Sequence, residues 1–163
     1  MQSNIFWFRR DLRIEDNTAL IQALNSSQST IPIFIFDINI IKKLPKDDAR
    51  ISFIYNQLIG INKYLKRFNS SLLVLQGDPE KLILDLVQKK NISALYSNLD
   101  YEPYAIERDM KITNSLKKYN TQHLQFKDQV IFGPKEILKD DGNPYTVYTL
   151  SLIHISEPTR PLR

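Results

Sequence analysis

Short apolar runs with the composition of β-strands alternate along this chain with segments whose apolar residues recur at helical spacing. Five runs are rich in β-branched and aromatic residues: Ile5–Phe8, Ile31–Asp37, Leu72–Leu75, Ala94–Ser97 and Gln122–Phe126. Alternation of this kind builds βαβ units, in which the strands are parallel and helices cover both faces of the sheet. The pattern therefore predicts an α/β fold.

Helices are expected between these strands, and the longest spans Ala49–Phe68. Its apolar residues recur at steps of three and four and form one stripe: Ile51, Ile54, Leu58, Ile61, Leu65 and Phe68. Asp16 is expected to cap a helix that runs to Leu24, since its carboxylate can accept from first-turn amides. We expect a doubly wound, Rossmann-like parallel sheet of about five strands.

Two further helices have clear sequence boundaries. Asp78 followed by Pro79 is typical of an N-cap and a first helical position, and predicts a helix that ends at Lys89. Another helix is expected after Pro103, ending near Lys118. Its residues predicted to point inward are Ile106, Met110 and Leu116.

Length and composition are those of one ordinary globular domain. The chain has 163 residues, no cysteine and a net charge of +4 with scattered basic residues, which is too mild a balance to indicate nucleic-acid binding. No apolar run approaches the roughly 20 residues of a membrane span, and the amino terminus lacks the layout of a secretory signal. We expect a cytoplasmic protein with no membrane contact.

In an open parallel sheet, ligands bind beyond the carboxyl ends of the strands, so the loops there are the ones to inspect. The four glycines form neither a dinucleotide-binding fingerprint nor a P-loop. The informative loop follows the first strand, where Trp7–Leu20 contains three arginines and three acidic residues. Such density indicates either a surface salt-bridge network or residues that position a ligand or an interface.

The segment Trp7–Leu20 resembles the opening signature of the DNA photolyase–cryptochrome family, Trp-Phe-Arg-x-Asp-Leu-Arg-x-x-Asp-Asn-x-Ala-Leu. Every fixed position matches. The motif residues expected at an interdomain surface are Arg9, Arg10, Asp11, Arg13, Asp16 and Asn17. Two later segments, Asn98–Asp109 and Gly142–Thr149, resemble family segments in the same order.

These segments predict three parts of the chain. Residues 1–132 form the photolyase-type α/β domain, and residues 133–149 begin the linker toward a second domain. Residues 150–163 do not resemble the family, and Leu150–Arg160 matches the translation of a transposase sequencing adapter. We interpret 150–163 as a non-native tail, so that His154 is not a functional residue and Ile153–Arg163 is poorly packed.

The resemblance implies a light-dependent DNA repair lyase that splits cyclobutane pyrimidine dimers by electron transfer from reduced FAD. The flavin site, the catalytic residues and the DNA-binding face lie in the family's carboxyl-terminal helical domain, which is absent here. We therefore expect this fragment to be inactive alone, monomeric, and a partner of that missing flavin domain. The alternatives are the corresponding domain of a cryptochrome-type blue-light photoreceptor and a stand-alone nucleotide-binding α/β module.

The resemblance also implies an antenna-chromophore site in this domain. Arg50, Asp100 and Glu102 resemble contacts of deazaflavin- or flavin-type antennae, and Phe34 and Tyr101 are expected to pack nearby. A methenyltetrahydrofolate antenna is disfavoured, because the histidine and the Asn-Glu pair expected for it are missing. For each of these residues, a purely structural role is the alternative.

Other polar residues are interpreted as structural. His123, in the last predicted strand, is expected at the rim of the sheet rather than as a catalytic base. Asp140 and Asp141 are expected in a solvated turn. The sequence predicts no catalytic residue and no metal site.

Overall fold

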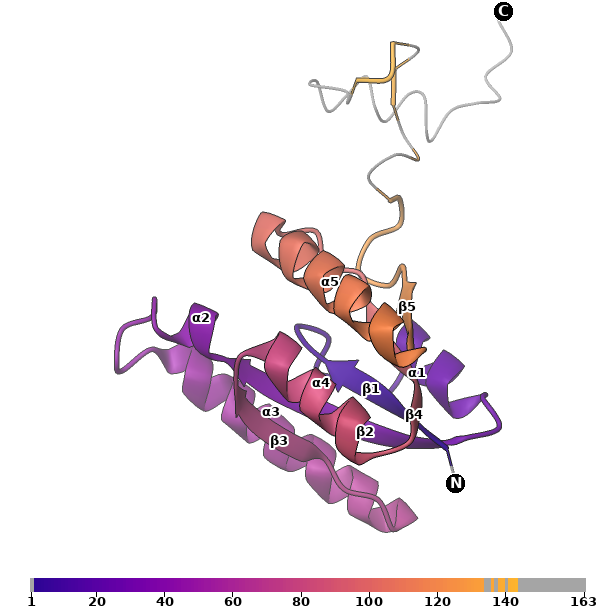
Figure 1. Ribbon diagram of the computed structural model, residues 1–163. Helices are drawn as coiled ribbons and strands as arrows, with labels where there is room; N and C mark the ends of the chain where they lie inside the picture. Colours follow the sequence, from indigo (N-terminus) through magenta and orange to yellow (C-terminus); the bar gives the residue numbers. More distant parts are fainter. Residues whose placement is uncertain (1, 134–135, 137, 140, 144–163) are drawn as a thin grey trace, which may run out of the picture. The chain divides into compact units, whose positions relative to one another are not determined.

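The computed structural model describes residues 2–133, 136, 138–139 and 141–143. One sheet contains five strands in the order β3-β2-β1-β4-β5, and every pairing is parallel (Figure 1). The strands are β1 (Ser3–Phe8), β2 (Ser29–Asp37), β3 (Leu73–Gly77), β4 (Ile92–Asn98) and β5 (Gln122–Phe126). The order reverses between β1 and β4, so the predicted doubly wound fold is confirmed.

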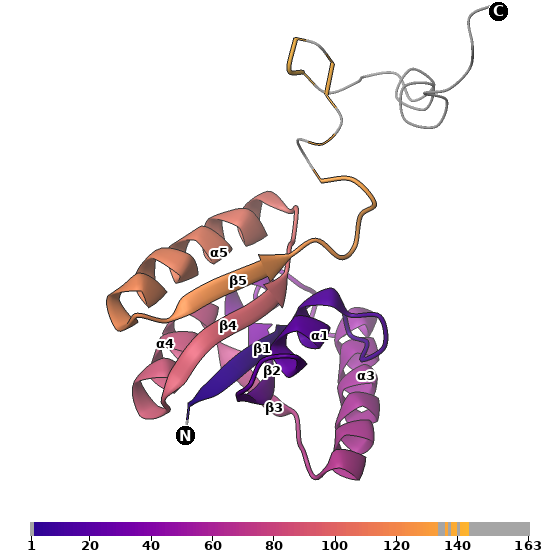
Figure 2. The same ribbon diagram turned by 90° about the vertical axis from the view of Figure 1, so that its right-hand side faces the viewer.

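Helices cover both faces of this sheet (Figure 2). They are α1 (Thr18–Leu24), α2 (Ile38–Ile41), α3 (Ala49–Leu65), α4 (Pro79–Lys89) and α5 (Pro103–Leu116). Short 3₁₀ turns, Lys66–Phe68 and Lys117–Tyr119, extend α3 and α5. The single turn α2 was not predicted, because four residues are too few to show a helical period.

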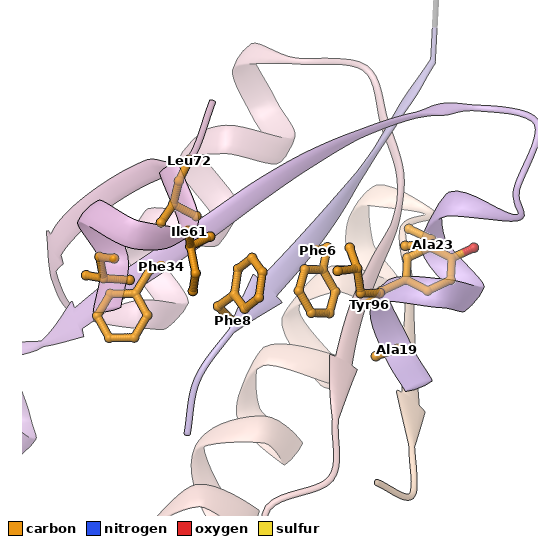
Figure 3. Packing of buried hydrophobic residues seen from close by; sticks show 11 residues of the cluster. Phe6, Phe8, Ala19, Ala23, Phe34, Ile61, Leu72 and Tyr96 are labelled. Atoms are coloured by element: carbon orange, nitrogen blue, oxygen red, sulfur yellow. The ribbon is translucent and has the colours of Figure 1, made fainter. Parts of the chain in front are cut away.

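Alternate residues of the central strand feed two separate cores. Phe6 and Phe8 pack with α1, α3 and Phe34 on one face (Figure 3). Ile5 and Trp7 pack with α4 and α5 on the other face. All four β1 side chains are at least 98% buried, so β1 is the strand around which both layers assemble.

The helix caps agree with the sequence at α4 and differ at α1. Asp78 caps α4 as predicted, with its carboxylate accepting from the Lys81 amide at 3.1 Å. At α1 the N-cap is Asn17, whose side chain accepts from the amide of Leu20. Asp16, the predicted cap, has a left-handed φ of 49° and turns the chain just before the helix.

The buried stripe of α5 also differs from the prediction. Ile106 and Met110 are 49% and 60% exposed, whereas Ile112 and Leu116 are fully buried. The stripe includes Asp109, which is buried because it pairs with arginines. Apolar spacing alone therefore gave the wrong face for the first half of the helix. In α3 the predicted stripe holds through Leu65, but Phe68 is exposed.

The chain divides into two compact units, Met1–Gln129 and Val130–Arg163. In the second unit, the Gly133 amide donates to Glu136, and the Asn143 amide donates to Asp141 in a tight turn. Asp140, His154 and the proposed tail 150–163 lie outside the described residues. Within the described part of the chain, no helix is both long and apolar enough to cross a bilayer.

Which face of α5 is buried can be tested by the same substitution, isoleucine to alanine, at two positions of the helix. Ile112→Ala should lower the free energy of unfolding by about 2–5 kcal/mol, because it leaves a cavity in a closed core. Ile106→Ala should lower it by only about 0.5 kcal/mol, because that side chain is half in solvent. Urea denaturation measures both, and equal losses would contradict the assigned phase.

Candidate functional site

Two polar clusters meet at the carboxyl end of β1, where the strand order reverses. The first, here called the capping cluster, consists of Asp11, Asn17, Asn98 and Asp128. The Asn98 side-chain amide donates to the carboxylate of Asp11 and, at 2.9 Å, to the side-chain oxygen of Asn17. Asp11, Asn17 and Asn98 are at least 96% buried, so these contacts are shielded from water.

The capping cluster satisfies the first turn of α1. The backbone amides of Thr18, Ala19 and Leu20 donate to the side-chain Oδ1 atoms of Asp128, Asn98 and Asn17, at 3.0, 2.9 and 3.2 Å respectively. First-turn amides have no partner within their own helix, and side-chain acceptors replace the missing carbonyls. Each acceptor comes from a different part of the chain.

Asp128 has a second function in this cluster. Its carboxylate accepts from the Arg13 guanidinium at 2.7 Å and from the Thr18 hydroxyl at 3.0 Å. Burial alone would raise the pKa of Asp128, but the hydrogen bonds from Thr18 and Arg13 outweigh it and lower the pKa below its usual value. The ionised form therefore holds the segment after β5 against the loop that precedes α1.

The second group, here called the arginine cluster, consists of Trp7, Arg9, Asp37, Arg108 and Asp109. The guanidinium carbons of Arg9 and Arg108 lie 5.2 and 4.7 Å from the centroid of the Trp7 ring. Asp109 accepts from Arg9 at 2.5 Å and from Arg108 at 2.9 Å. The four charged side chains are at most 9% exposed, and two cations balance two carboxylates.

The arginine cluster reaches the next strand through Asp37 at the end of β2. Asp37 accepts from the Tyr104 hydroxyl at 2.7 Å, and one of its oxygens lies 3.9 Å from Arg108. Burial and the hydrogen bond to the Asp37 carboxylate raise the pKa of Tyr104 to about 12. Tyr104 is therefore a neutral donor at physiological pH.

The structure separates the six predicted motif residues into two sets. Arg9, Asp11 and Asn17 are held inside the domain by the contacts above. Arg10 and Arg13 have side chains 60% and 40% exposed, and Asp16 is also exposed. The loop is thus neither a surface salt-bridge network alone nor wholly available to a partner.

The predicted antenna residues do not form one contact group. Arg10 lies 3.7 Å from Asp100 and 3.4 Å from Glu102. Arg50 instead pairs with Asp48 at the start of α3, a contact that lowers the pKa of Asp48 to about 2. Phe34 is in the core beside Phe36. The Tyr101 hydroxyl is buried without a partner among the described residues.

A cavity of about 530 Å³ opens beside the arginine cluster. Its walls come from α2 and the residues just after it, the start of α4, and α5, and they include Asn39, Lys43, Tyr104, Arg108 and Lys111. This volume falls within the roughly 300–1,000 Å³ of small-molecule sites. Trp7 Nε1 and one terminal nitrogen of Arg9 are buried nearby without an acceptor in the described part of the chain.

His123 lies between two hydroxyl groups. The Thr113 hydroxyl donates its one proton to the carbonyl of Asp109, so its oxygen accepts from His123 Nδ1 at 2.8 Å. His123 Nε2 then accepts from the Ser97 hydroxyl at 3.0 Å. Burial is the main cause that lowers the pKa of His123, to about 4. The charges of Arg9 and Arg108 lower this pKa further, and the charge of Asp109 opposes the shift. The ring is a neutral structural link rather than a base.

The clusters contain residues that sequence reasoning did not select. Asn98, Arg108 and Asp109 were noted only as part of a matching segment, and Asp37 and Asp128 follow predicted strands but were not selected as site residues. Their one sequence signal is position, because each polar residue follows or faces the carboxyl end of a strand. No group of three or more potential ligand side chains forms a metal site among the described residues.

Comparison with known proteins gives consistent results. The family model described as DNA photolyase matches residues 4–158. The deoxyribodipyrimidine photo-lyase of a Synechococcus strain is 38% identical over 144 residues, which is 88% of this chain and 30% of that protein. The matched part of this chain therefore spans less than a third of the length of that relative.

Solved structures show the same fold. A class III photolyase from Agrobacterium tumefaciens matches 91% of this chain and 30% of its own, with a TM-score of 0.81 and 26% identity. An archaeal photolyase from Sulfolobus tokodaii, solved with two FAD molecules, matches 98% of this chain and 35% of its own, with a TM-score of 0.80 and 31% identity.

The neutral state of His123 predicts a pH dependence. Its pKa is about 6.5 when unfolded and about 4 when folded, so the unfolded state binds more protons between these values. The free energy of unfolding should therefore have its full value above pH 6.5, and it should fall by about 2 kcal/mol between pH 7 and 5. Urea denaturation in a His154→Gln background leaves His123 as the single histidine. His123→Gln should flatten the profile, and parallel profiles would contradict this assignment.

Proposed function

Because the chain belongs to the DNA photolyase family, we propose that it is the amino-terminal domain of a light-dependent lyase that splits cyclobutane pyrimidine dimers. The observation that carries this proposal is the use of the family's opening motif. The side chains of Arg9, Asp11 and Asn17 are buried, and their hydrogen bonds and ion pair fix the loop that follows β1 at the carboxyl edge of the sheet. The motif residues Arg10 and Arg13 are paired with acidic residues of this domain but keep part of their side chains in solvent, where they would face a second domain.

The rest of the protein would hold FAD, which supplies the electron that splits the dimer, and would bind the damaged DNA. The relatives extend well beyond the part that matches this chain, which supports a missing carboxyl-terminal domain. Within this chain, Arg10, Arg13 and Asp16 would form the interdomain surface. Their side chains reach solvent from a loop whose base is fixed by the capping cluster.

An antenna chromophore of flavin or deazaflavin type is the ligand proposed for this domain. Arg50 is 70% exposed and, in the described part of the chain, its side chain binds its near neighbour Asp48 alone, so it can turn toward a ligand. Asp100 and Glu102 offer carboxylates beside Arg10. The unpartnered Tyr101 hydroxyl fits a ligand with a polar edge, because a buried hydroxyl without a partner is costly.

Titration of the full chain tests the antenna proposal. Flavin mononucleotide or a deazaflavin should bind with a saturable change in fluorescence, and methenyltetrahydrofolate should not. Tyr101→Phe should weaken binding about fivefold through loss of one hydrogen bond. The control Tyr64→Phe, at a tyrosine on α3, should bind like the parent chain. Absence of binding by any of the three compounds would reject an antenna site here.

A chimera tests the repair function. Residues 1–149 joined to the remaining part of the Synechococcus relative should bind FAD and restore light-dependent survival to ultraviolet-irradiated cells that lack photolyase. The same cells kept in the dark are the control. A folded chimera that photoreduces its flavin but leaves dimers intact would contradict the repair proposal and indicate a photosensor.

A further inference from the structure

A second cavity, of about 470 Å³, lies at the opposite end of the sheet from the clusters described above. It opens where β1 and β4 begin side by side, near the amino terminus marked in Figure 2. Its wall includes Asn4, Ser26, Gln28, Ser93, Tyr119 and Asn120. None of the described lining residues carries a charge, and nearly all present an amide or a hydroxyl group.

Asn4, in the wall of this cavity, carries an acceptor without a partner among the described residues. The Ser26 hydroxyl donates its single proton to the Ala23 carbonyl at 2.6 Å, so Ser26 Oγ must accept from Asn4 Nδ2 at 2.7 Å. That contact fixes the orientation of the Asn4 amide. Asn4 Oδ1 therefore remains buried without a hydrogen bond, on a residue that is 1% exposed.

Ser93 adds a second group without a partner in the same wall. Ser3 is opposite Ile92 and Asn4 is opposite Ala94, so Ser93 is the extra residue of a β-bulge. Bulges redirect a side chain out of the regular strand alternation and occur often beside binding sites. The Ser93 hydroxyl is buried and has no partner in the described part of the chain.

We propose that this cavity binds a neutral polyhydroxyl ligand, a sugar or polyol of one or two rings, through Asn4 Oδ1 and the Ser93 hydroxyl. A ligand hydroxyl group can both donate and accept a hydrogen bond. It can therefore donate to Asn4 Oδ1, and it can donate to or accept from the Ser93 hydroxyl. Among the residues that the structure describes, the lining offers no cation for a phosphate and no carboxylate for a metal. Of its two tyrosines, Tyr96 gives little open ring surface for a planar base, since it is 8% exposed and already stacks on Phe126, whereas Tyr119 is 42% exposed.

The volume and position of the cavity agree with this assignment. About 470 Å³ is within the range of small-molecule sites. The cavity lies at the amino ends of the strands, whereas the proposed antenna site lies at their carboxyl ends. The two proposals therefore rest on different residues and can fail independently.

The test is a nuclear magnetic resonance titration of the isotope-labelled full chain with maltose, inorganic phosphate and adenosine. Maltose should give saturable shifts of the Asn4 side-chain amide and of the backbone amides of Ser26 and Ser93. Phosphate and adenosine should give none. Shifts that do not saturate, shifts located elsewhere, or saturation by adenosine instead of maltose would overturn the proposal.

Two serine variants separate binding from folding. Ser93→Ala should weaken maltose binding about fivefold through loss of one hydrogen bond. Its thermal midpoint should be unchanged or higher, because the hydroxyl has no partner to lose. Ser71→Ala, at an exposed serine outside the cavity, should bind maltose like the parent chain. Equal affinities of all three chains would also overturn the proposal.

Discussion

The packing at the carboxyl edge of the sheet depends on the contacts of the Asp109 carboxylate. It accepts from two guanidinium groups that both pack against the ring of Trp7, and it also accepts from Gln125 of β5 at 2.9 Å. One side chain of α5 thus joins β1 and β5. Burying ions is costly, and such a network persists because every charge has an opposite partner. In comparable networks, loss of one partner costs about 3–5 kcal/mol, because the other charge stays buried.

The same contact shows what could be predicted of the fold. Strand positions followed from short apolar runs, and the α4 cap followed from Asp78 and Pro79, because both signals are local. The face of α5 did not follow, because a buried aspartate breaks the apolar stripe and one of its two arginines, Arg9, is 100 residues away in sequence. Asn17 replaced Asp16 as the α1 cap for a related reason, since the asparagine amide also has to reach Asp11 and Asn98.

The candidate site was predictable in location more than in detail. The density of charge after the first strand identified the correct loop, but sequence did not separate Arg9, turned inward, from Arg10, turned outward. The cavity at the amino ends had no sequence signal. Asn4, Ser26 and Ser93 are common residues in separate segments. Only the bulge in β4 and the direction of the Ser26 hydroxyl proton connect them to one proposed site.

The capping of α1 has a consequence for how the chain acquires its structure. A seven-residue helix is too short to be stable by itself, and its first-turn acceptors include Asn98 at the end of β4 and Asp128 beyond β5. During synthesis the ribosome must release more than a hundred further residues before this helix is complete. Although α1 is encoded first among the helices, its cap is complete only when β4 and the segment after the edge strand β5 are in place.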